Sequence, residues 1–370
     1  MAELRIDFPR HGDVVSHHDG TETANGLAIT VRGQCPSSAS VTVNGARASV
    51  VGSAFQAQTT LAESVSSLVA TDGKEKASST ILYDRNSFPR YRLSVDDNIW
   101  VFSEIGRNPS RYGSLFDHWY LAFFKKVHDD FGTQVHMNIY FEEPEVGFDL
   151  TQFPDKYKRE WEDNSDWLRL SFHALSNDCY SGKIYKKGSY ETIMHDCQKV
   201  TEQILRFAGE KSLCRNYTTL HWAETTPDGA RALRDCGFKG LTGRFGFYST
   251  GAPVGTRYHL GEEENAYLMN RNMYYEPELR FYIVNCPQFL NGVQVRDVVP
   301  FYDSLLKGTD THVPFDVIDL LVHEEHFWRG YEGYQADNPD RVLAAVRWAT
   351  DRGLKPVQFD KGIAGNASWE

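Results

Sequence analysis

Carboxylate and imidazole side chains follow five hydrophobic segments that have the composition of β-strands. YRLSV is followed by Asp96 and Asp97, LRLSF by His173, YTTL by His221, VIDLLV by the string His323, Glu324, Glu325 and His326, and PVQF by Asp360. Carboxylates and imidazoles are the groups that bind divalent metal ions and transfer protons. In a parallel β/α barrel the carboxyl ends of all strands open on one mouth, so these residues are expected to form one catalytic site.

The spacing of these residues does not match several common catalytic motifs. His323 and His326 lie three residues apart after a predicted strand, whereas the zinc-protease motif needs two histidines four apart on one helix. The sequence contains neither a G-x-S-x-G nucleophile elbow nor the glycine pattern of a phosphate-binding loop. A metalloprotease, a serine hydrolase and a nucleotide-driven enzyme are therefore not indicated.

From residue 85 onward, predicted strands alternate with predicted helices, which is typical of an α/β fold with a parallel sheet or barrel. Apolar residues recur on one helical face between residues 191 and 208, with Ser189 near the start and Gly209 after the end. A second helix is predicted to begin at Asn338-Pro339 and to end before Gly353. The predicted strands cover residues 91–95, 135–141, 168–172, 217–220, 281–284, 317–322 and 356–359.

Residues 1–84 differ in composition from the rest of the chain. They contain only the aromatic residues Phe8, Phe55 and Tyr83, although 13% of the whole chain is aromatic. Apolar residues alternate with polar ones, and Asn44-Gly45 is a strong hairpin signal. We therefore predict a β-sandwich domain over residues 1–84 and a catalytic domain over residues 85–370.

The charge balance excludes some partners. The chain of 370 residues has a formal charge of −11 and no basic run longer than a lysine pair, so nucleic acid is not an expected partner. No segment approaches the roughly 18 apolar residues of a membrane span. As written, the protein is expected to be cytoplasmic, or secreted or at the cell surface if a leader has been removed. The oligomeric state is left open.

Four segments resemble the polysaccharide deacetylase, or NodB-homology, family of carbohydrate esterases. They are LSVDD (93–97), SFHALSN (171–177), HWAETTPDGARALRDCGF (221–238) and IDLLVHEEHF (318–327). The resemblance covers about residues 88–362 and rests on the order of the strand-end residues. The stretch VTVNGARASVVGSAFQAQTTL (41–61) resembles the immunoglobulin-like modules found beside carbohydrate-active enzymes; whether it binds glycan or serves as a spacer is left open.

The family resemblance implies a distorted (β/α) barrel of about seven strands and a metal-dependent hydrolase that removes an N- or O-acyl group, acetyl above all, from a carbohydrate. The metal would be zinc or another divalent ion. By the family pattern, Asp96 is the general base, Asp97 and His173 bind the metal, and His323 is the general acid. Residues expected near the substrate are Trp100, Trp222, Glu224 and Glu324.

Two departures from the family pattern leave alternatives open. Asn177 stands where the family usually has a histidine ligand, and His221, Glu224 and His323 are the other candidates for the third metal ligand. The expected arginine-proline-aromatic motif is also absent. One alternative function is hydrolysis of another C–N bond, or of a glycosidic bond by Asp96 and Glu324, on the same barrel. Another is a non-catalytic carbohydrate-binding protein.

Overall fold

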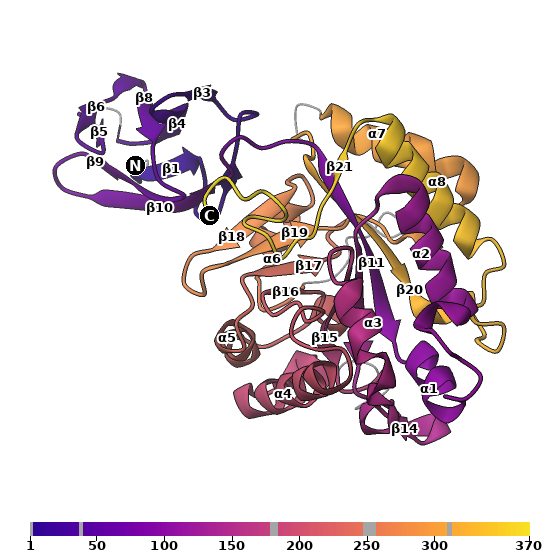
Figure 1. Cartoon of the computed structure of the whole chain (residues 1–370). Coiled ribbons are helices and arrows are strands. Elements are labelled where there is room, and N and C mark those ends of the chain that lie inside the picture. The colour runs from indigo at the N-terminus through magenta and orange to yellow at the C-terminus, as the bar shows by residue number, and fades with distance from the viewer. Residues whose placement is uncertain (1–2, 37–39, 178–183, 247–256, 309–312) are drawn as a thin grey trace. The chain divides into compact units, whose positions relative to one another are not determined.

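The computed structural model describes residues 3–36, 40–177, 184–246, 257–308 and 313–370. The chain divides into two units (Figure 1). The first unit comprises Met1–Phe88, Met273–Tyr282 and Asn366–Glu370, and the second comprises Pro89–Asn272 and Ile283–Gly365. The division at Phe88 lies close to the expected boundary at residue 84, but the first unit also takes in two later segments that the sequence did not suggest.

The first unit contains two five-stranded sheets. One has the order β1-β4-β8-β7, with β3 also paired to β4, and the other has the order β2-β10-β9-β5-β6. Residues of both sheets form one apolar cluster, which includes Ile29, Phe55 and Leu68. Asn44 and Gly45 have positive φ and connect β5 to β6, as expected for this turn. The strands are β1 (Arg5–Phe8), β2 (Val14–Val15), β3 (Thr21–Thr23), β4 (Gly26–Gln34), β5 (Thr42–Val43), β6 (Ala46–Arg47), β7 (Ser49–Val51), β8 (Ala54–Leu61), β9 (Val65–Thr71) and β10 (Lys76–Tyr83).

The main sheet of the second unit is parallel and has the order β15-β12-β11-β20, with β21 also paired to β11. Another sheet has the order β16-β17-β19-β18, and the division between the units falls within β19. The strands of these two sheets are β11 (Arg90–Asn98), β12 (Val135–Tyr140), β15 (Leu168–Ala174), β16 (Tyr217–Thr218), β17 (Gly240–Gly243), β18 (Met273–Glu276), β19 (Phe281–Asn285), β20 (Val317–His323) and β21 (Lys355–Pro356), of which β18 is assigned to the first unit. Strands β13 (Glu142–Glu143) and β14 (Phe148–Asp149) form a small separate pair.

Eight α-helices are present in the described part of the chain: α1 (Trp100–Arg107), α2 (Trp119–Phe131), α3 (Lys158–Asp163), α4 (Tyr190–Phe207), α5 (Pro227–Asp235), α6 (Glu262–Leu268), α7 (Val298–Lys307) and α8 (Asn338–Asp351). The mixed α/β character predicted from the sequence is confirmed. Over the described ranges the strands of the second unit form separate sheets rather than one closed barrel. None of the helices described is long and apolar enough to cross a membrane.

Both helices that the sequence predicted most clearly are confirmed. Helix α4 is capped by the Ser189 side chain, which accepts a hydrogen bond from the Thr192 amide, and it is followed by Gly209 at a φ of +84°. Helix α8 starts at Asn338 with proline in its first turn. Strand β17 was not predicted, because its four residues, GLTG, include two glycines and lack the usual composition of a strand.

The prediction that Asp360 joins the other strand-end residues is wrong. The predicted strand 356–359 is reduced to β21, which ends at Pro356 and pairs only with Arg90 and Tyr91 at the beginning of β11. The chain that follows β21 therefore stays near the amino ends of the strands. Asp360 forms an ion pair there with Arg169, near the start of β15, at 3.7 Å.

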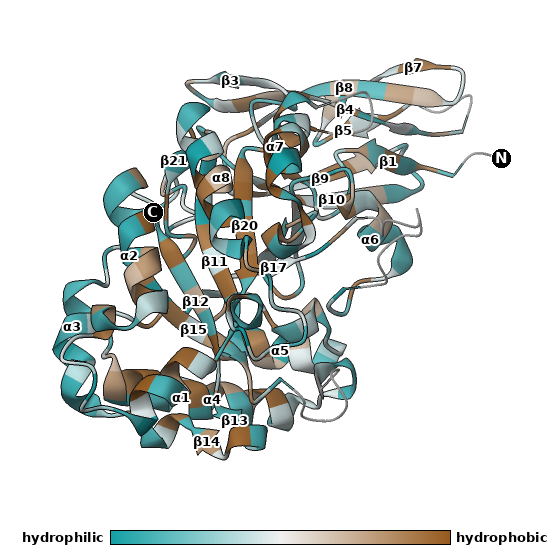
Figure 2. Cartoon of the chain, turned by 90° about the vertical axis from the view of Figure 1, so that its right-hand side faces the viewer, coloured by the Kyte–Doolittle hydropathy of each residue, from teal (hydrophilic) through white to brown (hydrophobic). Residues whose placement is uncertain are grey.

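Polar residues occupy alternate positions along four neighbouring strands of the main sheet. Successive side chains of a strand point to opposite faces, so every second residue shares a face. On one face, β11 carries Arg92, Ser94 and Asp96, β12 carries His136, Asn138 and Tyr140, β15 carries Ser171 and His173, and β20 carries Asp319 and His323. Figure 2 shows that β11 and β12 carry both hydrophobic and hydrophilic residues. This polar face leads to the carboxyl ends of the strands.

Candidate active site

A cavity of about 340 Å³ lies in the second unit at the carboxyl ends of β11, β15 and β20. Nine residues singled out from the sequence line it: Asp96, Asp97, His173, Asn177, His221, Trp222, His323, Glu325 and His326. They come from four distant parts of the chain. The cavity therefore combines carboxylates, imidazoles and an exposed indole in one small volume.

A β-bulge explains how two consecutive aspartates reach the same cavity. The pairing of β11 with β12 shifts register between Val95 and Asn98, and Asp97 has a φ of +66°. In a regular strand Asp96 and Asp97 would point to opposite faces. The bulge turns the second side chain, as bulges beside active sites commonly do.

Three potential metal-binding atoms converge at this point. The Asp97 Oδ1 atom lies 2.9 Å from His173 Nε2 and 3.3 Å from His221 Nδ1, and the two histidine nitrogens are 3.2 Å apart. A tetrahedral zinc ion with ligand bonds of about 2.0–2.2 Å holds neighbouring donor atoms about 3.3–3.6 Å apart. The observed separations are close to that range, so the donor types and their spacing both fit a divalent metal.

The position of His221 depends on an unusual backbone turn. His221 begins a short 3-10 helix (His221–Ala223), in which Trp222 and Ala223 have φ values of +61° and +48°. Positive φ is a strained conformation for a bulky residue such as tryptophan. The turn directs His221 to Asp97, while the Trp222 side chain remains 49% exposed and also lines the cavity.

The His173 ring is held in position through the ring nitrogen that does not face Asp97. His173 Nδ1 is hydrogen-bonded to the backbone carbonyl of Thr219, so Nδ1 carries the proton and Nε2 is left to face Asp97. Metal-binding histidines commonly have their other ring nitrogen held in this way. Asn177 lies farther out: its side-chain oxygen is 3.5 Å from the Tyr140 hydroxyl, and the residue is exposed.

Tyr140 is a member of this cluster that the sequence did not reveal. Its hydroxyl donates a hydrogen bond to Asp97 and lies 2.8 Å from His221 Nδ1. The signal was present in the alternation along β12, which places Tyr140 on the same face as His136 and Asn138. The cavity is also lined by Arg244, Arg257 and Asn291, which were not singled out either.

The two aspartates have different electrostatic environments. Burial opposes ionisation of Asp97, but its close contacts with the His173 and His221 side chains hold its pKa well below the usual value. Burial and the neighbouring charge of Asp97 raise the pKa of Asp96 well above the usual value, against a hydrogen bond from Asn138. A carboxylate with a low pKa suits a metal ligand, and one with a raised pKa suits a proton acceptor.

His323 faces the cavity from the end of β20. Its Nδ1 atom lies 2.9 Å from the Asn291 side-chain oxygen, so Nδ1 is the protonated nitrogen and Nε2 is available to the cavity. Burial lowers the pKa of His323 to about 4, although the negative charge of Asp97 acts in the opposite direction. The imidazole is therefore neutral near pH 7.

Glu324 and Trp100 do not line the cavity. The fully buried Glu324 carboxylate accepts hydrogen bonds from the backbone amides of Ile99, Trp100 and Val101, at 2.6, 2.9 and 2.8 Å. It therefore caps the amino end of α1 from another part of the chain. The Trp100 indole donates to Glu143 and packs edge-on against Trp328.

Glu224 lies beside the cavity rather than on its wall. Its carboxylate is 3.6 Å from Arg257, which does line the cavity. Burial of Glu224 together with this ion pair leaves it as a partner of Arg257 rather than a ligand of the Asp97 cluster.

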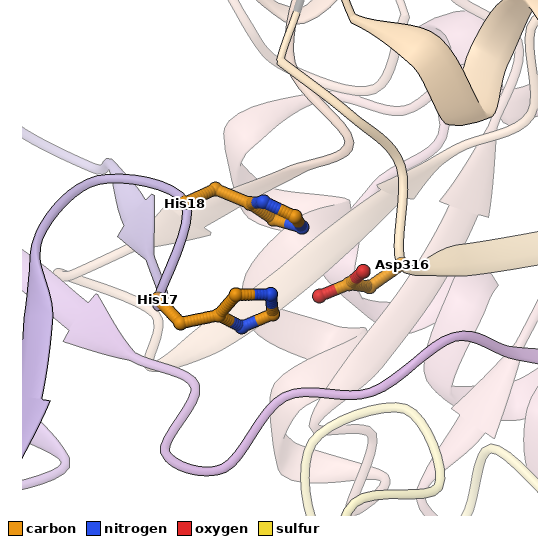
Figure 3. A group of neighbouring side chains, drawn as sticks. All are labelled: His17, His18 and Asp316. Atoms are coloured by element: carbon orange, nitrogen blue, oxygen red, sulfur yellow. The ribbon is translucent and has the colours of Figure 1, made fainter.

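Figure 3 draws another set of side chains of the metal-binding type. His17 and His18 belong to the first unit, and Asp316 directly precedes β20 in the second. Since these residues come from different units, we assign no site to them.

No protein-family model matches the chain, and no curated protein matches it. Among solved structures, a CE4 esterase of Streptococcus mutans is similar at 11% identity and a TM-score of 0.35, over 73% of this chain and 85% of that one. The Bc1960 peptidoglycan N-acetylglucosamine deacetylase is similar at 12% identity and a TM-score of 0.32, over 73% and 87%.

A CE4 family pseudoenzyme of Bacillus anthracis, BA3943, is similar at 8% identity and a TM-score of 0.35, over 72% of this chain and 63% of that one. At TM-scores below 0.5, these likenesses establish neither a family nor an activity for the chain.

Proposed function

We propose that the protein is a metal-dependent hydrolase that removes an N- or O-acyl group, acetyl above all, from a carbohydrate. The observation that carries the proposal is the convergence of Asp97, His173 and His221 beside Asp96 and His323 in one cavity. The first three provide a ligand set for a divalent metal, with zinc as the first candidate. The other two provide a base and a proton donor.

Each residue has a role that its environment supports. When bound, the metal would polarise the acyl carbonyl group and make a water molecule more acidic. Asp96, whose pKa is raised by burial and by Asp97, accepts the proton of the attacking water. His323 Nε2 faces the cavity and passes a proton to the leaving amine or alcohol. Because the imidazole is neutral before the reaction, that proton has to reach it during turnover, and the proton taken by Asp96 is the available source.

His221 takes the place of the third ligand in this proposal. Asn177 offers a neutral amide, which is a poor zinc ligand, and it lies outside the group of three atoms that meet at Asp97. The mouth of the cavity carries the exposed Trp222 indole, on which the apolar face of a sugar ring can stack. A carbohydrate substrate is consistent with this wall of the cavity.

The alternative of a glycosidase that uses Asp96 and Glu324 is not favoured. Such an enzyme needs two carboxyl groups on either side of one bond. Both oxygens of Glu324 are occupied by backbone amides of α1, and the side chain is fully buried. A non-catalytic carbohydrate-binding protein would leave the paired aspartates and His323 without a role.

We also propose that the second unit is a distorted (β/α) barrel of about seven strands and that the first unit is an immunoglobulin-like accessory β-sandwich. The parallel order β15-β12-β11-β20 supports the first point. The single apolar cluster shared by the two sheets of the first unit supports the second.

Two isosteric variants test the proposed chemistry. Asp96→Asn should keep its metal and its melting temperature but lose about 10²–10⁴ in the rate of acetate release from small acetylated sugars. Asp97→Asn should lose the metal as well, which is measured by metal analysis after dialysis. If Asp96→Asn retains the parental rate on a substrate that the parent deacetylates, or if the parent works equally well in the presence of a chelator, the proposal is wrong.

A further inference from the structure

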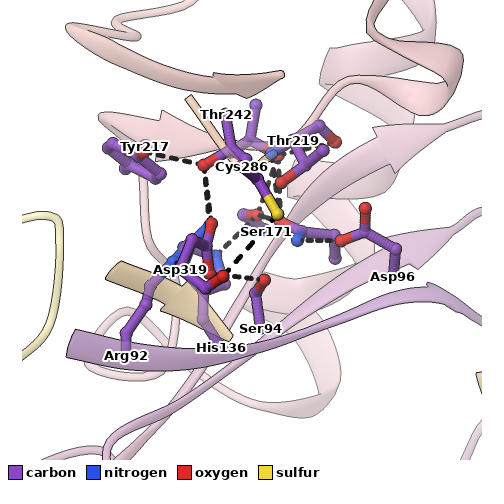
Figure 4. Close-up of polar contacts among 12 residues, drawn as sticks. Arg92, Ser94, Asp96, His136, Ser171, Tyr217, Thr219, Thr242, Cys286 and Asp319 are labelled. Atoms are coloured by element: carbon purple, nitrogen blue, oxygen red, sulfur yellow. Dashed lines mark hydrogen bonds and ion pairs between the residues drawn. The ribbon is translucent and has the colours of Figure 1, made fainter. Parts of the chain in front are cut away.

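A continuous chain of buried hydrogen bonds runs along the polar face of the main sheet and ends on Asp96 (Figure 4). Its members in order are Arg92, His136, Ser171, Asn138 and Asp96, and the successive contacts measure 2.5, 2.8, 2.7 and 2.6 Å. They come from β11, β12 and β15, all in the second unit. Arg92, His136, Ser171 and Asn138 have no exposed surface.

The direction of every bond in this chain is determined by its first member. An arginine guanidinium can only donate hydrogen bonds, so His136 Nδ1 must accept from Arg92. Burial and the Arg92 charge hold the pKa of His136 well below its usual value, so the ring is neutral and its single proton lies on Nε2. His136 Nε2 therefore donates to Ser171, and the Ser171 hydroxyl donates to the Asn138 carbonyl oxygen.

The orientation of the Asn138 amide follows from these bonds. Its oxygen accepts from Ser171 and faces the Thr219 backbone amide, which can only donate, at 3.4 Å. The amide nitrogen is consequently directed at Asp96 Oδ1. A flipped amide would place its nitrogen against two donors and its oxygen against a carboxylate.

The origin of the chain is itself rigidly held. Asp319 on β20 forms an ion pair with Arg92 at 2.8 Å, and it accepts further hydrogen bonds from Ser94 and Thr242 at 2.8 and 2.7 Å. A buried ion pair with its remaining acceptor sites filled is costly to rearrange, because any partner left alone would be a buried charge. The guanidinium is thus fixed in position.

We propose that Asn138 is a positioning residue for Asp96 and that the Arg92–His136–Ser171 chain keeps its amide nitrogen directed at that carboxylate. One Asp96 oxygen is held by Asn138, which leaves the other oxygen toward the cavity for the water proton. This inference rests on the proposed function, because it assigns a supporting residue to the general base proposed there.

The decisive substitution is Asn138→Asp, which keeps the shape of the side chain but sets a second carboxyl group against Asp96, so that the two share one proton and Asp96 is no longer a free base. We expect kcat for acetate release to fall about 10–100-fold, the usual loss for a supporting residue, with KM and metal affinity little changed. Asn138→Leu removes both the donor and the acceptor of the amide and serves as a second variant if the first does not fold.

The matched control is Asn285→Leu. Asn285 is also buried in the second unit, but the hydrogen bonds that its side chain forms with described residues go to backbone groups, of Phe245, Leu268 and Arg271. It should lose stability while the folded protein keeps the parental kcat. Equal losses of kcat in Asn138→Leu and Asn285→Leu would overturn the proposal.

A double-mutant cycle separates positioning from general stabilisation. If Asn138 acts through Asp96, adding Asn138→Asp to Asp96→Asn should cause no further loss of kcat, whereas independent effects would multiply. Crystal structures provide a readout that does not depend on activity. In Asn138→Leu the Asp96 side chain should leave the rotamer that it has in the parent.

If the parent releases no acyl group, the proposed function fails, and the Asp96 rotamer still decides the positioning role. An unchanged Asp96 rotamer in Asn138→Leu, or multiplicative losses of kcat in the double-mutant cycle, would overturn the proposal that Asn138 positions Asp96.

Discussion

The two units of the protein bury different kinds of residue. The shared core of the first unit consists of apolar side chains, and the buried polar side chains among the described residues up to Phe88 are Asp13, Ser79 and Asp84. The main sheet of the second unit buries two arginines, two histidines and two carboxyl groups, namely Arg90, Arg92, His136, His173, Asp96 and Asp319. Burying such groups costs free energy unless each has a partner. The second unit therefore carries a free-energy cost of polar burial that stability alone does not require. The groups that cause it lie on the polar face of the main sheet, which leads to the candidate active site.

Within the second unit, two neighbouring carboxyl groups also differ in what they contribute. Glu324 is fully occupied as a cap of α1, while Glu325 lines the cavity, where burial and Asp97 raise its pKa well above the usual value. One buried carboxyl group thus serves the fold and the next serves the site. The following predictions test this separation between supporting and chemical roles.

The largest effect is expected at the cluster of Asp97, His173 and His221 in the second unit. His221→Ala should lower metal affinity about 10³-fold, because a structural metal is bound with about 10–16 kcal/mol and each ligand carries a share. Asn177→Ala, the matched control at the same cavity, should change it little. Both are measured by calorimetric titration with zinc. Equal losses in the two variants would contradict the assignment of His221 as the third ligand.

A core truncation in the first unit should affect stability without affecting chemistry. Phe55 is 2% exposed within the apolar cluster, so Phe55→Ala should lower the unfolding free energy by about 3–5 kcal/mol. The folded protein should keep the parental kcat. Calorimetry and kinetics at a temperature below the transition measure the two quantities. Val51→Ala, at a residue that is 78% exposed, is the control. A fall in kcat for folded Phe55→Ala would contradict the prediction, because it would show that the core of the first unit affects the chemistry of the second.

Glu324→Gln should change stability and its pH dependence. Burial raises the pKa of Glu324 to about 7, against the hydrogen bonds from the α1 amides. Since the folded state holds this proton at higher pH than the unfolded state, the contribution of Glu324 is fully present below about pH 4.5 and is lost as the pH rises to about 7, by about 3 kcal/mol.

Glu324→Gln should remove this slope, and it should cost about 1–3 kcal/mol at low pH because its amide nitrogen faces backbone donors. Denaturant unfolding between pH 4 and pH 8 measures both effects. Glu202→Gln, at an exposed position of α4, should leave the slope unchanged. An unaltered slope in Glu324→Gln would show that Glu324 does not titrate as inferred.

The smallest effect is expected at the mouth of the cavity. Trp222→Gly removes a bulky residue from a positive φ, and the relief of this backbone strain should offset the added flexibility of glycine. The melting temperature should therefore stay within a few degrees of that of the parent. The loss of a stacking surface worth about 0.5–1.5 kcal/mol should raise KM for a sugar up to about tenfold. Trp119→Ala, at a residue that is 46% exposed and outside the cavity, should leave KM unchanged.

The sequence predicted the strands that carry the site better than it predicted the site itself. The segments around β11, β12, β15 and β20 were identified from their apolar composition, and each lies within three residues of the observed limits at both ends. The predicted strand 356–359 was wrong because its pairing ends at Pro356, and pairing depends on a distant strand. The same misplaced strand led to the misassignment of Asp360.

By itself the sequence determined which residue types follow the strands and which residues share a face, because both depend only on chain order and on the two-residue period of a strand. Only the tertiary structure decided which of them meet. The bulge at Asp97 brings two consecutive aspartates to one side, and the left-handed turn at Trp222 directs His221 to them.

Within the string that follows β20, a 3-10 helix (Glu324–Phe327) turns each residue by about a third of a circle, which sends Glu324 to α1 and Glu325 to the cavity. These choices depend on backbone angles and on partners that lie far away in the chain, and for this reason no local pattern could reveal them.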